Sequence, residues 1–161
     1  MNMVETDKQE LEKIWSLIKD IDVAMLTTIT KEGLVSRPMQ TQEVEFDGDL
    51  WFMTKKDTHK FDELKQNPSV NVAYAGKAYV SIRGTAEIVD DRDKIEQYWN
   101  IAYEKMLKTT PDDPNLVLIK IKAETAEYWE VGNWVKMAIS IVNRLNNKET
   151  NQNINETIKL N

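Results

Sequence analysis

The sequence predicts a single α+β domain, mainly β, in which an antiparallel sheet curls into a barrel with helices at its periphery. The expected elements follow the order helix, three strands, helix, two strands, helix, strand. Hairpin-like connections outnumber helical crossovers, which favours an antiparallel barrel over a doubly wound parallel sheet. At 161 residues, the chain is long enough for one domain with a sizeable core.

The N-terminal part is expected to form one helix and three strands. Apolar residues recur at helical spacing between charged residues, which predicts an amphipathic helix over 5–20. Segments rich in β-branched residues predict strands at 22–29 and 34–45, on either side of the turn sequence TKEGL. The Asp-Gly turn in FDGDL leads into a third strand at 49–54.

The next part continues the barrel. A helix is expected from after Thr54 to about Gln66, where Asn-Pro ends it, and a strand follows at 69–75. Apolar and polar residues alternate over 79–89, which predicts a strand with one buried face. An Asp-rich start and an apolar stripe ending at Met106 predict another helix. After a loop, a long and bent strand is expected at 116–131.

The C-terminal segments carry weaker signals. Residues 132–145 read as an amphipathic helix, with Trp134, Met137, Ile141 and Leu145 near one face. This helix would pack on the barrel or a partner subunit, or cover an apolar substrate pocket. The single domain is therefore expected over 1–145, followed at 146–161 by a polar, Asn-rich tail that is mobile or lies on a partner.

Composition excludes several classes of function. The net charge is −6, which argues against a nucleic-acid-binding surface. The chain has no cysteine and one histidine, so nucleophilic triads and thiolate or His-rich metal sites have little to build on. We predict no catalytic side chain and no metal ligands. No apolar run is long enough to span a membrane, and residues 1–20 are too charged for a signal peptide, so a cytoplasmic protein is expected.

The strand-to-helix turn WFMTKKDTHKF, residues 51–61, gathers three lysines, two threonines and the only histidine. A helix N-terminus exposes unpaired N–H groups and a partial positive charge, so Lys60 in the first turn is unfavourable without an anionic partner. A bound phosphate would remove this cost. The simpler interpretation is that Asp57 or Thr58 caps the helix and that the lysines are solvated.

The segment VSRPMQT, residues 35–41, is the second unusual feature. Pro38 cannot donate to a sheet ladder, so it marks an edge strand or a gap in strand pairing. A gap beside Arg37 is a place where a ligand can take over backbone contacts, and the arginine can bind a phosphate through two hydrogen bonds.

These segments resemble, in the same order, the pyridoxamine-phosphate-oxidase-like split barrels, and most closely their small general-stress-protein branch. The resemblance covers roughly 5–130 and rests on SRPMQ, LWFMT, KKDTHKFDEL, NPSVNVAY, YVSIRGTAEIVDD and AEYWE. It implies a split β-barrel that binds FMN at a homodimer interface, and hence an FMN-dependent oxidoreductase linked to general stress.

The resemblance also implies the residues that contact FMN. Arg37, Thr58 and Lys60 match phosphate-binding positions. Pro38, Met39 and Gln40 would run along the isoalloxazine ring, and Met53 and Thr54 match the strand end beneath it. Tyr79 and Trp129 would come from the second subunit. His59 replaces a family arginine, so a phosphate contact and an exposed side chain both remain open.

The sequence also departs from the true oxidase at the substrate clamp. Where that enzyme has an Arg-x-His-x-Arg clamp for its phosphorylated substrate, this chain has Val135, Met137 and Ile139. A site without these groups loses most of its preference for a phosphorylated substrate over other molecules, so the chain is not expected to be an authentic pyridoxamine phosphate oxidase. The alternatives are a non-catalytic flavin store or redox sensor, a deazaflavin-binding relative, a haem protein whose only histidine is His59, or a module without a ligand.

Overall fold

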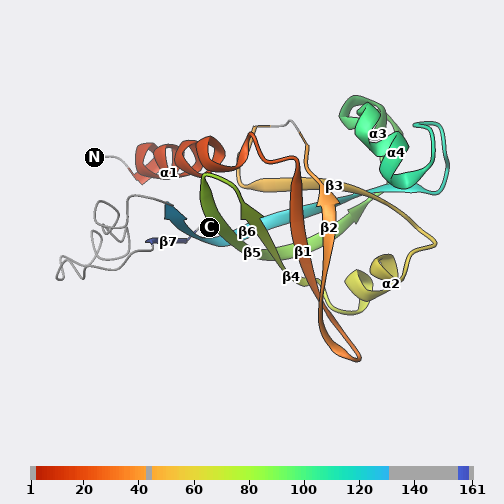
Figure 1. The fold of residues 1–161 in the computed structure, drawn as a ribbon, viewed down its shortest axis with the longest axis horizontal. Helices are drawn as coiled ribbons and strands as arrows, with labels where there is room; N and C mark the ends of the chain where they lie inside the picture. Colours follow the sequence, from red (N-terminus) through yellow and green to blue (C-terminus); the bar gives the residue numbers. More distant parts are fainter. Residues whose placement is uncertain (1–2, 43–44, 131–155, 160–161) are drawn as a thin grey trace.

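The computed structural model describes residues 3–42, 45–130 and 156–159, which form one sheet with peripheral helices (Figure 1). The helices in this part of the chain are α1 (Met3–Ile18), α2 (His59–Gln66), α3 (Arg92–Tyr98) and α4 (Ile101–Leu107). The strands are β1 (Val23–Thr30), β2 (Gly33–Gln40), β3 (Asp49–Lys55), β4 (Ser69–Ala75), β5 (Ala78–Val89), β6 (Leu116–Glu130) and β7 (Glu156–Lys159).

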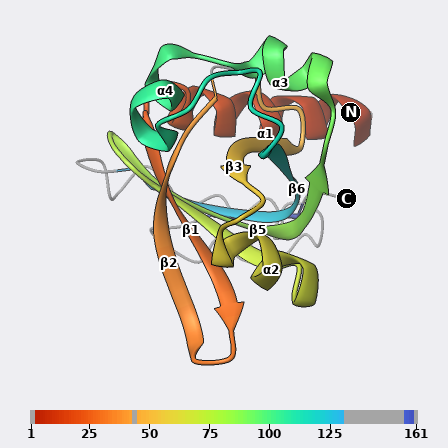
Figure 2. The same cartoon turned by 90° about the vertical axis from the view of Figure 1, so that its right-hand side faces the viewer.

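The sheet is antiparallel throughout its described strands and has the order β2-β1-β4-β5-β6-β3. Its two ends, β2 and β3, approach each other, and α4 contacts both of them. The sheet is therefore a curled half-barrel, with the β1–β2 hairpin projecting beyond it (Figure 2). This confirms the predicted antiparallel α+β split barrel and places Pro38 on an edge strand, as expected.

Along β1, β4 and β5, the residues that fill the barrel interior alternate with more exposed ones, whereas β6 begins with four buried residues in succession. In β5 the predicted alternation is confirmed, because Val80, Ile82 and Ala86 are buried while their neighbours face outward. A second, smaller cluster beneath α3 and α4 consists of Met53, Ile95, Tyr103, Leu116 and Leu118. The apolar face of α1 closes the main cluster through Ile14 and Ile18.

Two predicted elements differ in extent. The helix expected to run to Met106 is divided into α3 and α4, because the Asn100 side chain accepts a hydrogen bond from the backbone N–H of Ala102 and starts a new helix. The strand expected at 34–45 ends at Gln40, because its partner β1 begins at Val23, which pairs with Gln40.

The tail over 146–161 was expected to be mobile or to lie on a partner; the structure describes residues 156–159 of it, where β7 pairs with 125–128 of β6. The register between β5 and β6 shifts between Arg83 and Gly84, which pair with Thr125 and Ala123. The residue without a pairing partner on β5, Glu124, lies in β6, the long strand that was expected to be bent. The predicted helix at 132–145 and the domain boundary after it lie outside the described residues. In the described part of the chain, no helix is long and apolar enough to cross a membrane.

Candidate functional site

The candidate site lies where α2 packs on β1 beside the edge strand β2 (Figure 2). On β2, Arg37 and Met39 occupy successive positions on the inward face, so their Cα atoms are about 7 Å apart. Helix α2 brings Lys60 and Glu63 to the same place. The structure therefore brings together Arg37 and Met39 from VSRPMQT and Lys60 from the lysine-rich turn.

Arg37 is held by two hydrogen-bond partners. Its Nη1 and Nη2 atoms donate to the two carboxylate oxygens of Glu63, at 2.7 and 3.0 Å, and Nη1 also donates to Thr28 Oγ1 at 3.3 Å. The Thr28 hydroxyl donates in turn to Glu63 Oε2 at 3.3 Å. The hydrogen bonds from Arg37 lower the pKa of Glu63 against the opposing effect of burial, so the carboxylate stays ionised at neutral pH.

Lys60 is the second cation beside Arg37, and we call the place where these two side chains meet the Arg37–Lys60 corner. Lys60 Nζ donates to Met39 Sδ at 3.2 Å, and sulfur is a weak acceptor. No ion pair of Lys60 is found among the described residues. Burial lowers the pKa of Lys60, and the nearby Arg37 charge lowers it further, while Glu63 acts in the opposite direction. The lysine is thus a partly desolvated cation beside a second cation.

The start of α2 lies next to these charges. Thr58 is its N-cap residue, but the Thr58 side chain makes no capping hydrogen bond. Its hydroxyl donates instead to the carbonyl of Lys55 at 2.9 Å and lies 3.5 Å from the hydroxyl of the buried Thr54. The first-turn N–H groups of α2 therefore lack their usual side-chain acceptor. The His59 side chain is exposed at this helix start.

The other predicted contacts on these strands have different surroundings. Pro38 is exposed on the outer face of β2, and Gln40 is half-buried with its carbonyl accepting a hydrogen bond from Tyr103 at 3.2 Å. Met39 is buried, and Met53 packs in the smaller core cluster with Tyr103. The Met53 side chain is therefore occupied by core packing.

Tyr79 and Trp129 are direct cross-strand neighbours on β5 and β6. Tyr79 is 48 % exposed and Trp129 is half-buried, both near the end of the sheet where β5 begins. Arg37 pairs with Leu26, Leu26 with Val72 and Val72 with Ile82, so the corner lies level with Ile82. Tyr79 is three residues, about 10 Å, from Ile82 along β5, and β5 is three strands away from β2 across the sheet. Within one chain, this aromatic pair is thus separated from the Arg37–Lys60 corner.

Sequence reasoning missed Thr28 and Glu63. Thr28 had a readable signal, because it continues the inward phase of Ala24 and Leu26, and a polar residue in a buried phase needs a polar partner. Glu63 had only a weak signal in the sequence, because it follows Lys60 by three residues on the same helix and such residues are neighbours on the helix surface.

The corner has the composition of a phosphate site. Arg37 and Lys60 bring two positive charges against the one negative charge of Glu63, and the uncapped helix start adds N–H donors. These groups fit a phosphomonoester, which would supply the missing acceptors for both cations.

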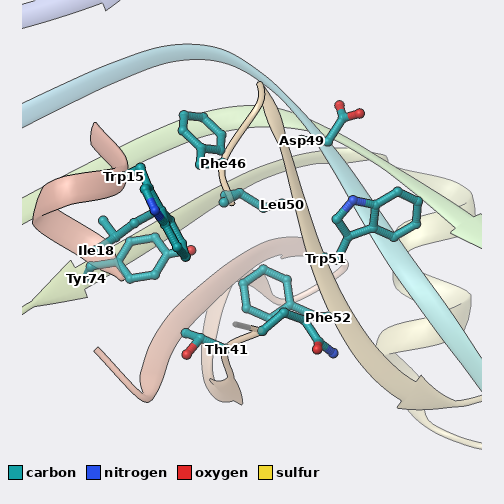
Figure 3. A pocket seen from close by; sticks show the side chains of 10 residues that line it. Trp15, Ile18, Thr41, Phe46, Asp49, Leu50, Trp51, Phe52 and Tyr74 are labelled. Atoms are coloured by element: carbon teal, nitrogen blue, oxygen red, sulfur yellow. The ribbon is translucent and has the colours of Figure 1, made fainter. Parts of the chain in front are cut away.

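Two other features concern where else a ligand or a metal ion could bind. A cavity of about 20 Å³ lies between α1 and β3, lined mainly by Trp15, Phe46, Leu50, Phe52 and Tyr74 (Figure 3). It has room for about one water molecule and contains none of the residues of the phosphate corner. Among the described residues, no group of three or more His, Asp or Glu side chains is placed to hold a metal ion.

Comparison with known proteins places this fold in a family. Residues 9–152 match the family described as pyridoxamine 5'-phosphate oxidase like. The protein Bli-3 of Neurospora crassa is 30% identical over 134 residues, which cover 74% of this chain and 64% of Bli-3. The chain thus spans a little less than two thirds of the length of this relative.

Solved structures show the same half-barrel. General stress protein 26 from Bacillus anthracis str. Sterne aligns with a TM-score of 0.67 and 29% identity, over 74% of this chain and 93% of that one. The general stress FMN/FAD binding protein from Xanthomonas citri aligns with a TM-score of 0.65 and 28% identity, over 76% and 89% of the two chains. Because the family match extends over most of the sequence and the fold agrees, the chain belongs to the pyridoxamine 5'-phosphate oxidase like family.

Proposed function

We propose that this protein binds FMN as a homodimer and is a flavin-dependent oxidoreductase of the general-stress type, not an authentic pyridoxamine phosphate oxidase. The observation that carries the proposal is the Arg37–Lys60 corner, where a partly desolvated ammonium and an anchored guanidinium lie at an uncapped helix start. The relative from Xanthomonas citri, an FMN/FAD binding protein, supports a flavin as the ligand.

The positive charges of Arg37 and Lys60 favour FMN, which carries a phosphate, over a flavin without one. A phosphate at this corner would accept from Lys60, from Arg37 and from the first-turn amides of α2. Each of these donors is held by the fold before the ligand arrives, so little ordering is needed on binding. Met39 and Gln40 continue β2 away from the corner and are the residues expected along the ring.

A second copy of the chain would complete the site. Within one chain, Tyr79 and Trp129 lie three and four strands across the sheet from Arg37 and about 10 Å along it, so they do not reach the corner of their own subunit. The outer face of the sheet also carries exposed apolar side chains where a solvated sheet would have polar ones, namely Val23, Met25, Ile29, Leu34 and Tyr79. Burial of this face against a second copy would cover these side chains and bring the aromatic pair to the partner's corner.

The chemistry would come from the cofactor. Bound FMN supplies hydride or electron transfer, and the protein supplies binding, orientation and access. In the described residues of the corner, Arg37 and Glu63 form a mutually satisfied ion pair, which leaves neither placed as a proton carrier. The role of the chain's own residues is therefore to hold the cofactor and to set its surroundings.

A fluorescence titration tests the proposal. Free FMN is added to the purified full chain, and the molar mass of the complex is measured by light scattering. Saturable binding on a dimer supports the proposal, and reduction of the bound flavin by a reduced nicotinamide donor supports the oxidoreductase reading. No binding of FMN, or a monomeric complex, contradicts the shared site, and turnover of pyridoxamine phosphate contradicts the exclusion of that activity.

A further inference from the structure

We infer that Glu63 and Thr28 are positioning residues that fix the Arg37 guanidinium so that one of its edges faces a phosphate. This inference rests on the proposed function, because the phosphate in question is that of the bound flavin. It adds two residues to the site that act through Arg37 and need not touch the ligand.

The three side chains form a closed set of hydrogen bonds. Arg37 donates to both oxygens of Glu63 and to the hydroxyl of Thr28, and Thr28 donates to Glu63 Oε2. Thr28 is 0% exposed, and the side chains of Arg37 and Glu63 are both mostly buried. Two parallel bonds to a carboxylate and a third to a buried hydroxyl leave the guanidinium plane little freedom to rotate.

The remaining donors define the free edge. A guanidinium has five N–H groups, and the bonds to Glu63 and Thr28 use both protons of Nη1 and one of Nη2. The second proton of Nη2 and the proton of Nε are left, and these two are parallel and lie on one edge. Such a pair matches two oxygens of a phosphate, so the carboxylate and a phosphate can share one arginine without competing for the same protons.

The charge of Glu63 also has a local purpose. Lys60 and Arg37 repel each other, and this repulsion contributes to the lowered pKa of Lys60 while Glu63 opposes it. Without the carboxylate, Arg37 would keep only its hydrogen bond from Nη1 to Thr28, and the repulsion from Lys60 would favour a turn of the guanidinium toward solvent. The cost of a negative charge near the phosphate is thus offset by keeping both cations in place.

Glu63 could instead compete with the phosphate for Arg37, and this role predicts a different effect of its removal. If the carboxylate were an internal competitor occupying the phosphate position on Arg37, then its removal would strengthen FMN binding. A positioning role requires that removal weakens binding, and that the loss is confined to ligands with a phosphate.

The experiment measures the dissociation constants of FMN and riboflavin for the full chain and its variants. Glu63→Gln keeps the size of the side chain but removes its charge, and it is expected to raise the Kd of FMN about tenfold, the loss of one charge-assisted hydrogen bond. The Kd of riboflavin, which has no phosphate, should stay the same. Asp62→Asn, an exposed carboxylate on the same helix, is the matched control and should change neither constant.

Two further variants separate positioning from a general structural effect. Thr28→Val removes the hydroxyl and should weaken FMN binding. Thr28→Ser keeps the hydroxyl and should bind FMN as the wild type does. In a chain that already carries Arg37→Ala, Glu63→Gln should no longer weaken FMN binding tenfold, because its positioning effect passes through the arginine, and a loss of the same size would overturn that role.

The outcomes separate the positioning role from the proposed function. Unchanged or tighter FMN binding by Glu63→Gln, or equal losses for FMN and riboflavin, overturns the positioning role while the proposed function stands. A wild-type chain that binds neither flavin overturns both.

Discussion

Replacement of Lys60 by methionine separates the electrostatic role of this side chain from its packing. Met keeps an unbranched stem against Met39 but removes an ammonium group whose pKa is lowered by burial and by Arg37. A charge-assisted hydrogen bond to a phosphate is worth about 1.5–3 kcal/mol. The Kd of FMN should therefore rise about 10- to 150-fold, while that of riboflavin stays unchanged.

The same substitution should act in the opposite direction on folding. In the free protein the ammonium is partly desolvated beside a second cation, and no ion pair within the described residues compensates it. An apolar chain in its place should raise the free energy of unfolding by on the order of 1 kcal/mol. For a chain of this length, that corresponds to an increase in Tm of roughly 2–4 °C.

Fluorescence titration with both flavins and thermal unfolding of the ligand-free protein measure the two effects. Lys65→Met is the matched control, because Lys65 is exposed in the last turn of the same helix and carries the same charge. Equal weakening of FMN by both variants would show that the effect is the overall charge of α2. A parallel loss of riboflavin binding, or a marked loss of stability, would refute the assignment of Lys60 to the phosphate.

Three further predictions use other parts of the structure. The affinity for FMN should fall as the pH rises through the pKa of Lys60, which lies below the ordinary value of 10.5, because the free amine no longer attracts the phosphate. Titrations of FMN from neutral to alkaline pH measure this decline, which should be absent in Lys60→Met. A decline that persists in Lys60→Met contradicts the assignment. Gly84→Ala should reduce the free energy of unfolding by about 1–3 kcal/mol in urea denaturation, because its Cβ would collide with the backbone carbonyl oxygen of Lys122, and an unchanged midpoint would contradict this. Met25→Lys, on the outer sheet face, should shift the light-scattering mass toward the monomer, whereas Met106→Lys on α4 should not, although both residues are about equally exposed at 40% and 43%; a dimer that tolerates both excludes this face as the interface.

Most of the fold could be predicted from sequence because its signals are local. The alternation in β5 and the helical spacing in α1 depend on burial of one face, and both were read correctly. The break between α3 and α4 was missed, since the apolar stripe continues through it and only the Asn100 cap reveals the new start. The strand β7 was missed because a short polar segment gains its strand conformation from pairing with β6, which is a tertiary effect.

The site could be predicted only in part. The lysine-rich turn and the edge proline are visible as local conflicts in the sequence, and the structure brings Arg37 and Lys60 to one corner. The pairing of Arg37 with Glu63 depends on how α2 lies over β1, and no local pattern specifies that contact. The separation of Tyr79 from the corner likewise follows only from the strand register.

A crystal structure of the full chain with FMN tests the central claim most directly. The phosphate is expected within hydrogen-bonding distance of Lys60 Nζ and of the Nε and Nη2 atoms of Arg37, with Glu63 still bound to Nη1 and Nη2 of the guanidinium. Tyr79 and Trp129 of a second copy are expected to contact the ring. A phosphate bound elsewhere, with Lys60 still against Met39, would contradict the account.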